Sequence, residues 1–164
     1  MSRFPNPGGG GPLRREGGYR PDSGGASITV LFDPEKPEQE LYDTLAEQQA
    51  RLLEINSSQL RKYFGETKDL YRQFNALTAT VHDDAEKQRI YCGRIEARFK
   101  MLRSKVAYAV GRKTLQLDHN FAAFLQDGIK KVQNHQHFVR FVMHFEAVVG
   151  FMYGLGNVDK KERR

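Results

Sequence analysis

The chain has 164 residues, of which 39% are apolar and 28% charged, so it is long enough for one soluble domain with a buried core. Its single cysteine, Cys92, cannot form an internal disulfide, which excludes a disulfide-stapled fold and makes a cytoplasmic location the expectation. The net charge of +6 favours an acidic partner, and the excess lies in residues 57–113, where thirteen basic residues outnumber six acidic ones.

Residues 1–33 are expected to form an N-terminal tail. Residues 1–27 hold eight of the fifteen glycines and four of the six prolines, a composition that buries too little apolar surface to offset the entropy of ordering it. This part is therefore predicted to be disordered. The strand-like run 28–32, Ile-Thr-Val-Leu-Phe, has no second predicted strand to pair with. We expect it to dock on the helical body or on another subunit.

Residues 34–156 are predicted to form a compact all-α bundle of about five helices. Prolines at 34 and 37 suit a helix entry, and a first, acidic helix is predicted over 38–54. Ser57 or Ser58 is the predicted N-cap of a second helix, which runs from about 58 to 79. Its apolar seam at helical spacing consists of Leu60, Tyr63, Phe64, Leu70, Tyr71, Phe74 and Leu77.

The third helix is predicted to be long and to end near Gly111. Asp83 and Asp84 open it, because two carboxylates are favourable at the positive N-terminal end of a helix. A fourth helix is expected from about 115 to 133. A fifth closes the bundle near Gly156 and is followed by a basic C-terminal tail over 157–164.

No membrane segment is predicted. The most apolar stretch, 138–155, is interrupted by Arg140, His144 and Glu146, which argues against a membrane span. The N-terminal arginines are not followed by the apolar region of a signal peptide. We therefore expect no membrane partner.

Two lines of basic residues follow the second and third helices. Arg61, Lys68 and Arg72 fall on one side of the second helix, roughly opposite its apolar seam. On the third helix, the basic residues spaced 7, 4, 7 and 7 apart fall within roughly 40° of one another on an ideal helix: Lys87, Arg94, Arg98, Lys105 and Arg112. Like charges so placed repel one another unless carboxylates or an external polyanion neutralise them.

The sequence leaves open whether internal carboxylates or an external polyanion neutralise these charges. The acidic first helix could pair internally with the basic lines through Glu38, Glu40, Asp43, Glu47 and Glu54, while arginine stems cover the core edge. An external polyanion is favoured because two consecutive helices carry independent basic lines, which together could follow the phosphates of a nucleic acid.

No residue constellation typical of an enzyme is found. His135, His137 and His144 lack a carboxylate or thiolate at metal-ligand spacing. Asp118 and His119 are adjacent on a predicted helix and point about 100° apart, which is poor geometry for a base and the group that orients it. We therefore expect no catalysis, no metal and no cofactor.

Three segments together resemble a known family. They are SSQLRKYFGE at the second helix, LRSKVAYAVGR at the end of the third, and FVRFVMHFEAVVGFMYGLG in the fifth. They are similar to the small subunit of the type III-A CRISPR effector, the Csm complex, over residues 56 to about 153. The family more often has a proline where this chain has Ser104, which leaves open whether the third helix is continuous near residue 103.

The resemblance implies an all-helical, non-catalytic subunit that stacks in more than one copy along a ribonucleoprotein filament. There it would contact the backbone of guide RNA and target RNA without reading sequence, beside other Csm subunits. The expected RNA-binding residues combine the matched motifs with the basic lines: Arg61, Lys62, Lys68, Arg72, Arg94, Arg98, Lys105, Arg112 and Lys113. The apolar Leu60, Tyr63, Phe64 and Tyr108 of the same motifs are assigned to the core by periodicity.

One alternative from a different class stays open. A structural helical adaptor would use its basic faces to pair with acidic helices or acidic neighbouring subunits, and it would not bind RNA.

Overall fold

The structure is a computed structural model that describes residues 30–112 and 117–160. In chain order the elements are α1 (Glu38–Leu41), α2 (Thr44–Arg51), α3 (Ser57–Thr78), α4 (Asp84–Ile90), η1 (Tyr91–Ile95), α5 (Glu96–Gly111), α6 (His119–Lys131) and α7 (His135–Leu155). The described residues contain no strand, only an isolated parallel bridge between Ile55 and Val158. The prediction of an all-α helical bundle is confirmed. The tail predicted over 1–27 lies outside the described residues.

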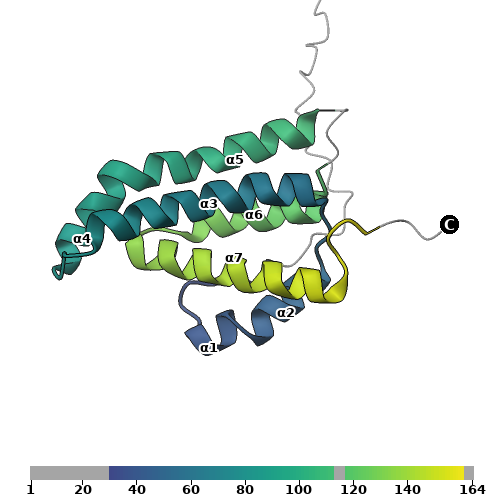
Figure 1. Cartoon of the computed structure of the whole chain (residues 1–164), viewed down its shortest axis with the longest axis horizontal. Helices are drawn as coiled ribbons and strands as arrows, with labels where there is room; N and C mark the ends of the chain where they lie inside the picture. The colour runs from purple at the N-terminus through teal and green to yellow at the C-terminus, as the bar shows by residue number, and fades with distance from the viewer. Residues whose placement is uncertain (1–29, 113–116, 161–164) are drawn as a thin grey trace, which may run out of the picture.

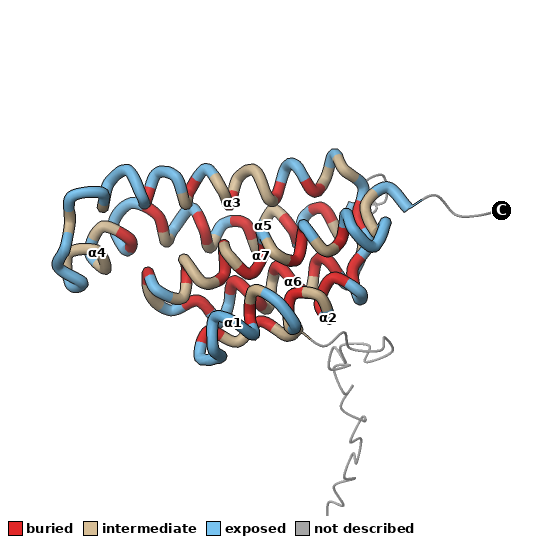
Figure 2. The backbone as a smooth tube through the Cα atoms, turned by 60° about the horizontal axis from the view of Figure 1, so that its bottom comes forward, coloured by how far each residue is buried: buried red, intermediate tan, exposed pale blue. Residues whose placement is uncertain are grey.

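The helices are arranged in layers about α7. Figure 1 shows α1 and α2 on one side of α7 and α3 and α5 side by side on the other, with α6 behind α3. Figure 2 shows buried positions on the inner sides of the helices and exposed positions along the outer edge of α3. The acidic N-terminal helices are therefore separated from α3 and α5 by α7.

The first helix is not continuous, so the prediction of one helix over 38–54 is wrong. α1 ends at Leu41, and α2 begins at Thr44 after a break at Asp43, whose φ of −126° and ψ of −94° are not helical. The carbonyl of Leu41 accepts a hydrogen bond of 2.6 Å from Nδ1 of His144 on α7. α7 thus supplies the hydrogen-bond donor for the Leu41 carbonyl, which the next turn of α1 would have supplied if that helix had continued.

The second predicted helix matches α3 within one residue at each end, but its cap differs. Asn56, not Ser57 or Ser58, is the N-cap, with its side chain accepting a 2.8 Å hydrogen bond from the backbone N–H of Gln59. Asn56 has the extended conformation that a cap needs, whereas Ser57 is already helical. At the other end of the helix Leu77 is 44% exposed, so its assignment to the apolar seam was wrong.

The third predicted helix is continuous through residue 103 and ends at Gly111, as predicted. Asp83 caps it by accepting a hydrogen bond from the backbone N–H of Glu86. Its one irregularity is the π-helical turn η1, which inserts an extra residue and changes the helical phase of α5 relative to α4. Lys87 precedes that turn, so the five-residue basic line predicted for an ideal helix is broken there.

α7 is the central helix of the core. Its length and composition would allow a membrane span, yet most of its large apolar side chains are buried or partly buried against α2, α3 and α6, with Tyr153 and Leu155 exposed near its end. It ends at Leu155, where Gly156 takes the left-handed conformation with φ of 72° that suits glycine. α6 begins later than predicted, at His119, and the expected residues 115 and 116 lie outside the described part of the chain.

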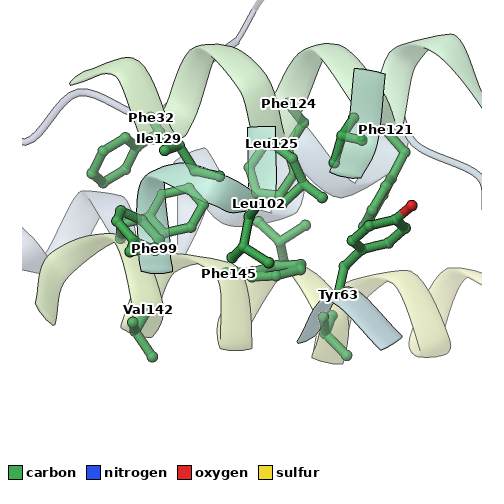
Figure 3. Packing of buried hydrophobic residues seen from close by; sticks show 14 of the residues in the cluster. Phe32, Tyr63, Phe99, Leu102, Phe121, Phe124, Leu125, Ile129, Val142 and Phe145 are labelled. Atoms are coloured by element: carbon green, nitrogen blue, oxygen red, sulfur yellow. The ribbon is translucent and has the colours of Figure 1, made fainter. Parts of the chain in front are cut away.

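The core is rich in phenylalanine and includes part of the predicted docking segment. Figure 3 shows Phe32, Phe99, Phe121, Phe124 and Phe145 converging from different parts of the chain. Phe32 is fully buried, with its ring edge-on to Phe141 at 5.3 Å between centroids. Residues 30–32 thus pack on the bundle.

The segment that follows α7 lies against the start of α3. Val158 bridges Ile55, and Oδ1 of Asp159 accepts a 2.7 Å hydrogen bond from the backbone N–H of Ser57. This bond is the largest cause that lowers the pKa of the Asp159 carboxyl, and the nearby Arg61 adds to it. Residues 157–160 of the predicted basic tail therefore pair with the body, and residues 161–164 lie outside the described part.

A glycine in α6 leaves no room for a side chain where α6 meets α7. A Cβ built on Gly128 would lie 2.6 Å from Cε2 of Phe141, whose ring is held by Phe32, Phe99 and Phe124 and cannot turn away. We expect Gly128→Ala to lower the free energy of unfolding by about 1–3 kcal/mol in urea titrations. The matched Gly65→Ala, where a Cβ meets nothing within 4 Å, should raise it by about 0.5–1 kcal/mol. Equal effects of the two changes would contradict the packing argument.

Candidate nucleic-acid interface

A shallow groove lies between α3 and α5 on the face remote from α1 and α2. It consists of two hollows of about 350 and 280 Å³. The residues that line them are Lys62, Glu66, Asp69 and Leu70 of α3 and Arg98, Met101, Ser104, Lys105 and Tyr108 of α5. We refer to this surface as the α3–α5 groove. Of the predicted RNA-binding residues, it brings together Lys62, Arg98 and Lys105.

The basic line predicted on α3 does not face this groove. Lys68 is only 19% exposed at its side chain and forms a 2.9 Å ion pair with Glu146 of α7. Arg72 is exposed and pairs with Asp69, one turn earlier on its own helix, at 2.7 Å. The two basic lines predicted from the sequence therefore do not merge into one surface.

Two cations of the groove have internal partners. Lys105 forms a 2.6 Å ion pair with Glu66 across the groove, and Nη1 of Arg98 donates a 2.7 Å hydrogen bond to Oε1 of Gln73 on α3. Both contacts join α5 to α3. They hold the walls of the groove at a defined distance, and the pair with Glu66 also neutralises the charge of Lys105.

Four predicted cations remain without a hydrogen bond or ion pair to another described residue. These are Arg61, Lys62, Arg94 and Arg112, and all are exposed. Lys62 lies over the buried Tyr63 ring at 5.4 Å, and Arg112 lies over the Tyr108 ring at 5.2 Å from the centroid. Lys113 lies outside the described residues. The unpaired charge is thus greatest where the N-terminal end of α3 meets the C-terminal end of α5.

Tyr108 is a surface residue, so its assignment to the core was wrong. Its side chain is 64% exposed, whereas Leu60 and Tyr63 of the same motifs are buried and Phe64 is partly buried, as predicted. On an ideal helix Tyr108 lies about 140° from the centre of the seam formed by Phe99, Val106 and Ala109. That angle was the signal in the sequence that could have identified it.

The acidic N-terminal helices do not neutralise the basic lines. Among the described residues, the ion pairs of this region join Glu47 to Arg51, Glu38 to Arg140 and Glu54 to Lys160. None of these cations belongs to the predicted RNA-binding set. The predicted pairing of the basic lines with the acidic segment 38–54 is therefore wrong. The carboxylates that pair with these basic residues belong to α3 and α7 instead.

Two histidines and one partly buried lysine have structural partners. His135 contacts Asp84 at 2.9 Å and His137 contacts Glu35 at 3.0 Å. Nζ of Lys100 donates to the carbonyls of Ile129 and Val132 at the end of α6, and burial lowers the pKa of this lysine. Within the described ranges, no group of three or more His, Cys, Asp or Glu side chains is placed to hold a metal ion.

The comparison with known families decides the class of protein. A family model described as Csm2 of type III-A matches residues 36–153, from the entry to α1 almost to the end of α7. The chain belongs to this Csm2 family. No curated protein and no solved structure matches it.

Csm2 proteins are the small subunits of the type III-A CRISPR complex, so this chain has the other Csm subunits as its partners. The Csm2 match covers both walls of the α3–α5 groove, the first two segments that carried the resemblance and all but the last three residues of the third. The family is a structural one within an intracellular effector complex. The groove is therefore a candidate surface for the nucleic acid or for the neighbours of a Csm2 subunit.

Proposed function

We propose that this Csm2 subunit binds the phosphate backbone of guide and target RNA along the α3–α5 groove, without sequence specificity and without catalysis. It would act in the cytoplasm and stack with further copies of itself inside the complex. The observation that carries the proposal is a set of exposed cations with no hydrogen bond or ion pair to another described residue, Lys62 and Arg112 above all, although Arg112 also lines a hollow with Glu54 and Asp159.

Over most of its length the groove is suited to binding the phosphate backbone of RNA rather than its bases. Arg98 lies on α5, and Arg112 directly follows Gly111, the last residue of that helix. Gly111 comes thirteen residues after Arg98, which corresponds to about 20 Å at 1.5 Å per residue. Such a row can follow several phosphates of one strand, and releasing their counterions supplies sequence-independent affinity. Glu66 and Asp69 occupy the middle of the groove, so we place the strongest phosphate contacts at the Lys62 and Arg112 end.

The structural adaptor is the competing function, and it has support in two contacts. The ion pairs of Lys68 with Glu146 and of Lys105 with Glu66 show that part of the basic surface serves packing between helices. An adaptor of this kind would join the Csm subunits without touching RNA.

Crosslinking inside the assembled complex separates the two functions. The tagged full-length chain is purified from its host, irradiated with ultraviolet light and digested, and crosslinked peptides are identified by mass spectrometry. We expect Csm subunits and a processed guide RNA to co-purify, with RNA attached to peptides of α3 and the end of α5. Co-purification of the subunits with crosslinks only elsewhere in the complex would establish the adaptor instead.

A further inference from the structure

The exposed Tyr108 has no role in the core and none in backbone binding. Its ring, 64% exposed, forms a wall of the hollow that Lys62, Ser104 and Lys105 complete. The guanidinium carbon of Arg112 lies 5.2 Å from the ring centroid, at a distance typical of a cation–π contact. A large aromatic side chain is thus held at the surface, at the end of the groove where the unpaired cations gather.

Proteins bind unpaired nucleotides with an exposed aromatic ring that has cations near it. A base stacks on an aromatic face, while cations beside the ring bind the phosphates on either side of that base. Lys62 stands across the hollow from Tyr108, and Arg112 lies at the ring itself. The phosphate sites and the stacking surface are therefore adjacent.

We propose that Tyr108 is a stacking site for an unpaired RNA base, so that this end of the α3–α5 groove takes a single-stranded or flipped-out nucleotide in preference to a continuous duplex. The inference rests on the proposed function, because the cations of the same groove supply the backbone contacts. It goes beyond that function by assigning a base contact, independent of base identity, to one residue.

The physical reason for the preference is access to the base. In a regular duplex each base is stacked between its neighbours, and a side chain at the surface meets only phosphate and ribose. A single strand can offer one base face to Tyr108 at little cost. Stacking on an aromatic side chain strengthens binding by about 5- to 150-fold per base, and every base has a face to offer.

Three RNAs of equal length test this inference on the full-length chain: a uridine single strand, the same strand with abasic ribose at each position, and a duplex. We expect the uridine strand to bind about 30-fold more tightly than the abasic strand, from the middle of the stacking range. Tyr108→Ala should remove this ratio, while Tyr108→Phe should keep it. Tyr153→Ala, at a 54% exposed tyrosine of α7 outside the groove, is the matched control and should change nothing.

A second measurement reports contact directly. The chain contains no tryptophan, so Tyr108→Trp introduces a single fluorophore at the proposed site. Its emission should be quenched by the uridine strand and much less by the abasic strand. Quenching of equal size by both would show that the ring does not meet a base.

The outcomes distinguish this inference from the proposed function. If wild type binds the uridine and abasic strands equally, or if Tyr108→Ala weakens both alike, the stacking site is wrong and backbone binding stands. If none of the three RNAs binds at low salt, both the stacking site and the backbone groove are wrong.

Discussion

Reversing Lys62 and Arg112 to glutamate together is expected to weaken RNA binding by the full-length chain on the order of 100-fold at moderate salt. A phosphate about 4 Å from a cation gains about 1 kcal/mol in water, and each reversal replaces that attraction with a repulsion of similar size. Two reversals therefore cost about 4 kcal/mol before salt screening reduces the effect. The RNA sequence should not matter, because no base edge is read.

The salt dependence gives a second expected result for the same variant. Each lost phosphate contact lowers the slope of log K against log salt by about 0.7–0.9, so two lost contacts lower it by about 1.4–1.8. Affinity is measured by fluorescence anisotropy at two salt concentrations and thermal stability by circular dichroism. The melting temperature should fall only slightly, since each cation loses an exposed cation–π contact worth about 0.5–1 kcal/mol and neither has a hydrogen bond or ion pair to another described residue.

The matched control has the same change of charge on the opposite side of the bundle. Lys36 precedes α1. Arg51 of α2 is 58% exposed at its side chain, and its one ion pair among the described residues is with Glu47, a surface pair worth about 0–1 kcal/mol. Lys36→Glu with Arg51→Glu should leave most of the RNA affinity intact. A control that loses as much affinity would show that net charge, not the groove, attracts RNA. A reversal variant that loses stability but keeps its salt slope would remove Lys62 and Arg112 from the interface.

Lowering the pH from 7 to about 4 should destabilise the protein by about 3 kcal/mol through one buried side chain, His144. The side chain is fully buried between the rings of Phe32 and Phe124. Burial lowers its pKa from 6.5 to about 4, against the smaller opposing effect of its hydrogen bond to the Leu41 carbonyl. Its Nε2 has no hydrogen-bond partner among the described residues, so protonation would leave a positive charge unsatisfied in the core.

The sign follows from comparing the two states. In the unfolded chain this histidine takes up a proton below pH 6.5, whereas in the folded chain it stays neutral until about pH 4. The unfolded state therefore binds more protons over this window, and the free energy of unfolding falls as the pH falls from 6.5 to about 4. Above pH 6.5 this contribution to stability is fully present.

Urea titrations at pH 7 and pH 4.5 on a non-titrating variant isolate this contribution. His144→Gln keeps an N–H that can reach the Leu41 carbonyl, and it should be less stable than wild type at pH 7 because ring packing is lost. Its further loss on acidification should be about 2–3 kcal/mol smaller than that of wild type. His82→Gln, at an exposed position between α3 and α4, should follow the wild-type profile. If His144→Gln also follows the wild-type profile, another group causes the loss of stability in acid.

Ion pairs between residues far apart in sequence change which basic residues are candidates for RNA binding. Lys68 and Glu146 are 78 residues apart in sequence, and Lys105 and Glu66 are 39 apart. Helical periodicity places each residue on a side of its own helix, but it does not say which helix lies next to that side. The acidic segment 38–54 looked like the natural partner from its composition, yet its helices pack on the far side of α7.

The sequence by itself determined the helical class, the approximate ends of α3, the C-terminal end of α5, the buried seam of α5 and the resemblance to the Csm2 family. These depend on the 3.6-residue period, on caps and glycines within a few positions, and on short motifs, all of which are local in the chain. The surroundings of single side chains were decided only by the tertiary structure. The Leu41 carbonyl ends α1 by accepting from His144, η1 shifts the phase of the third helix, and the packing of α5 beside α3 leaves Tyr108 exposed beside Lys62. Each of these depends on contacts between residues far apart in sequence, because the free energy of a charge or an aromatic ring is set by the groups that surround it in space.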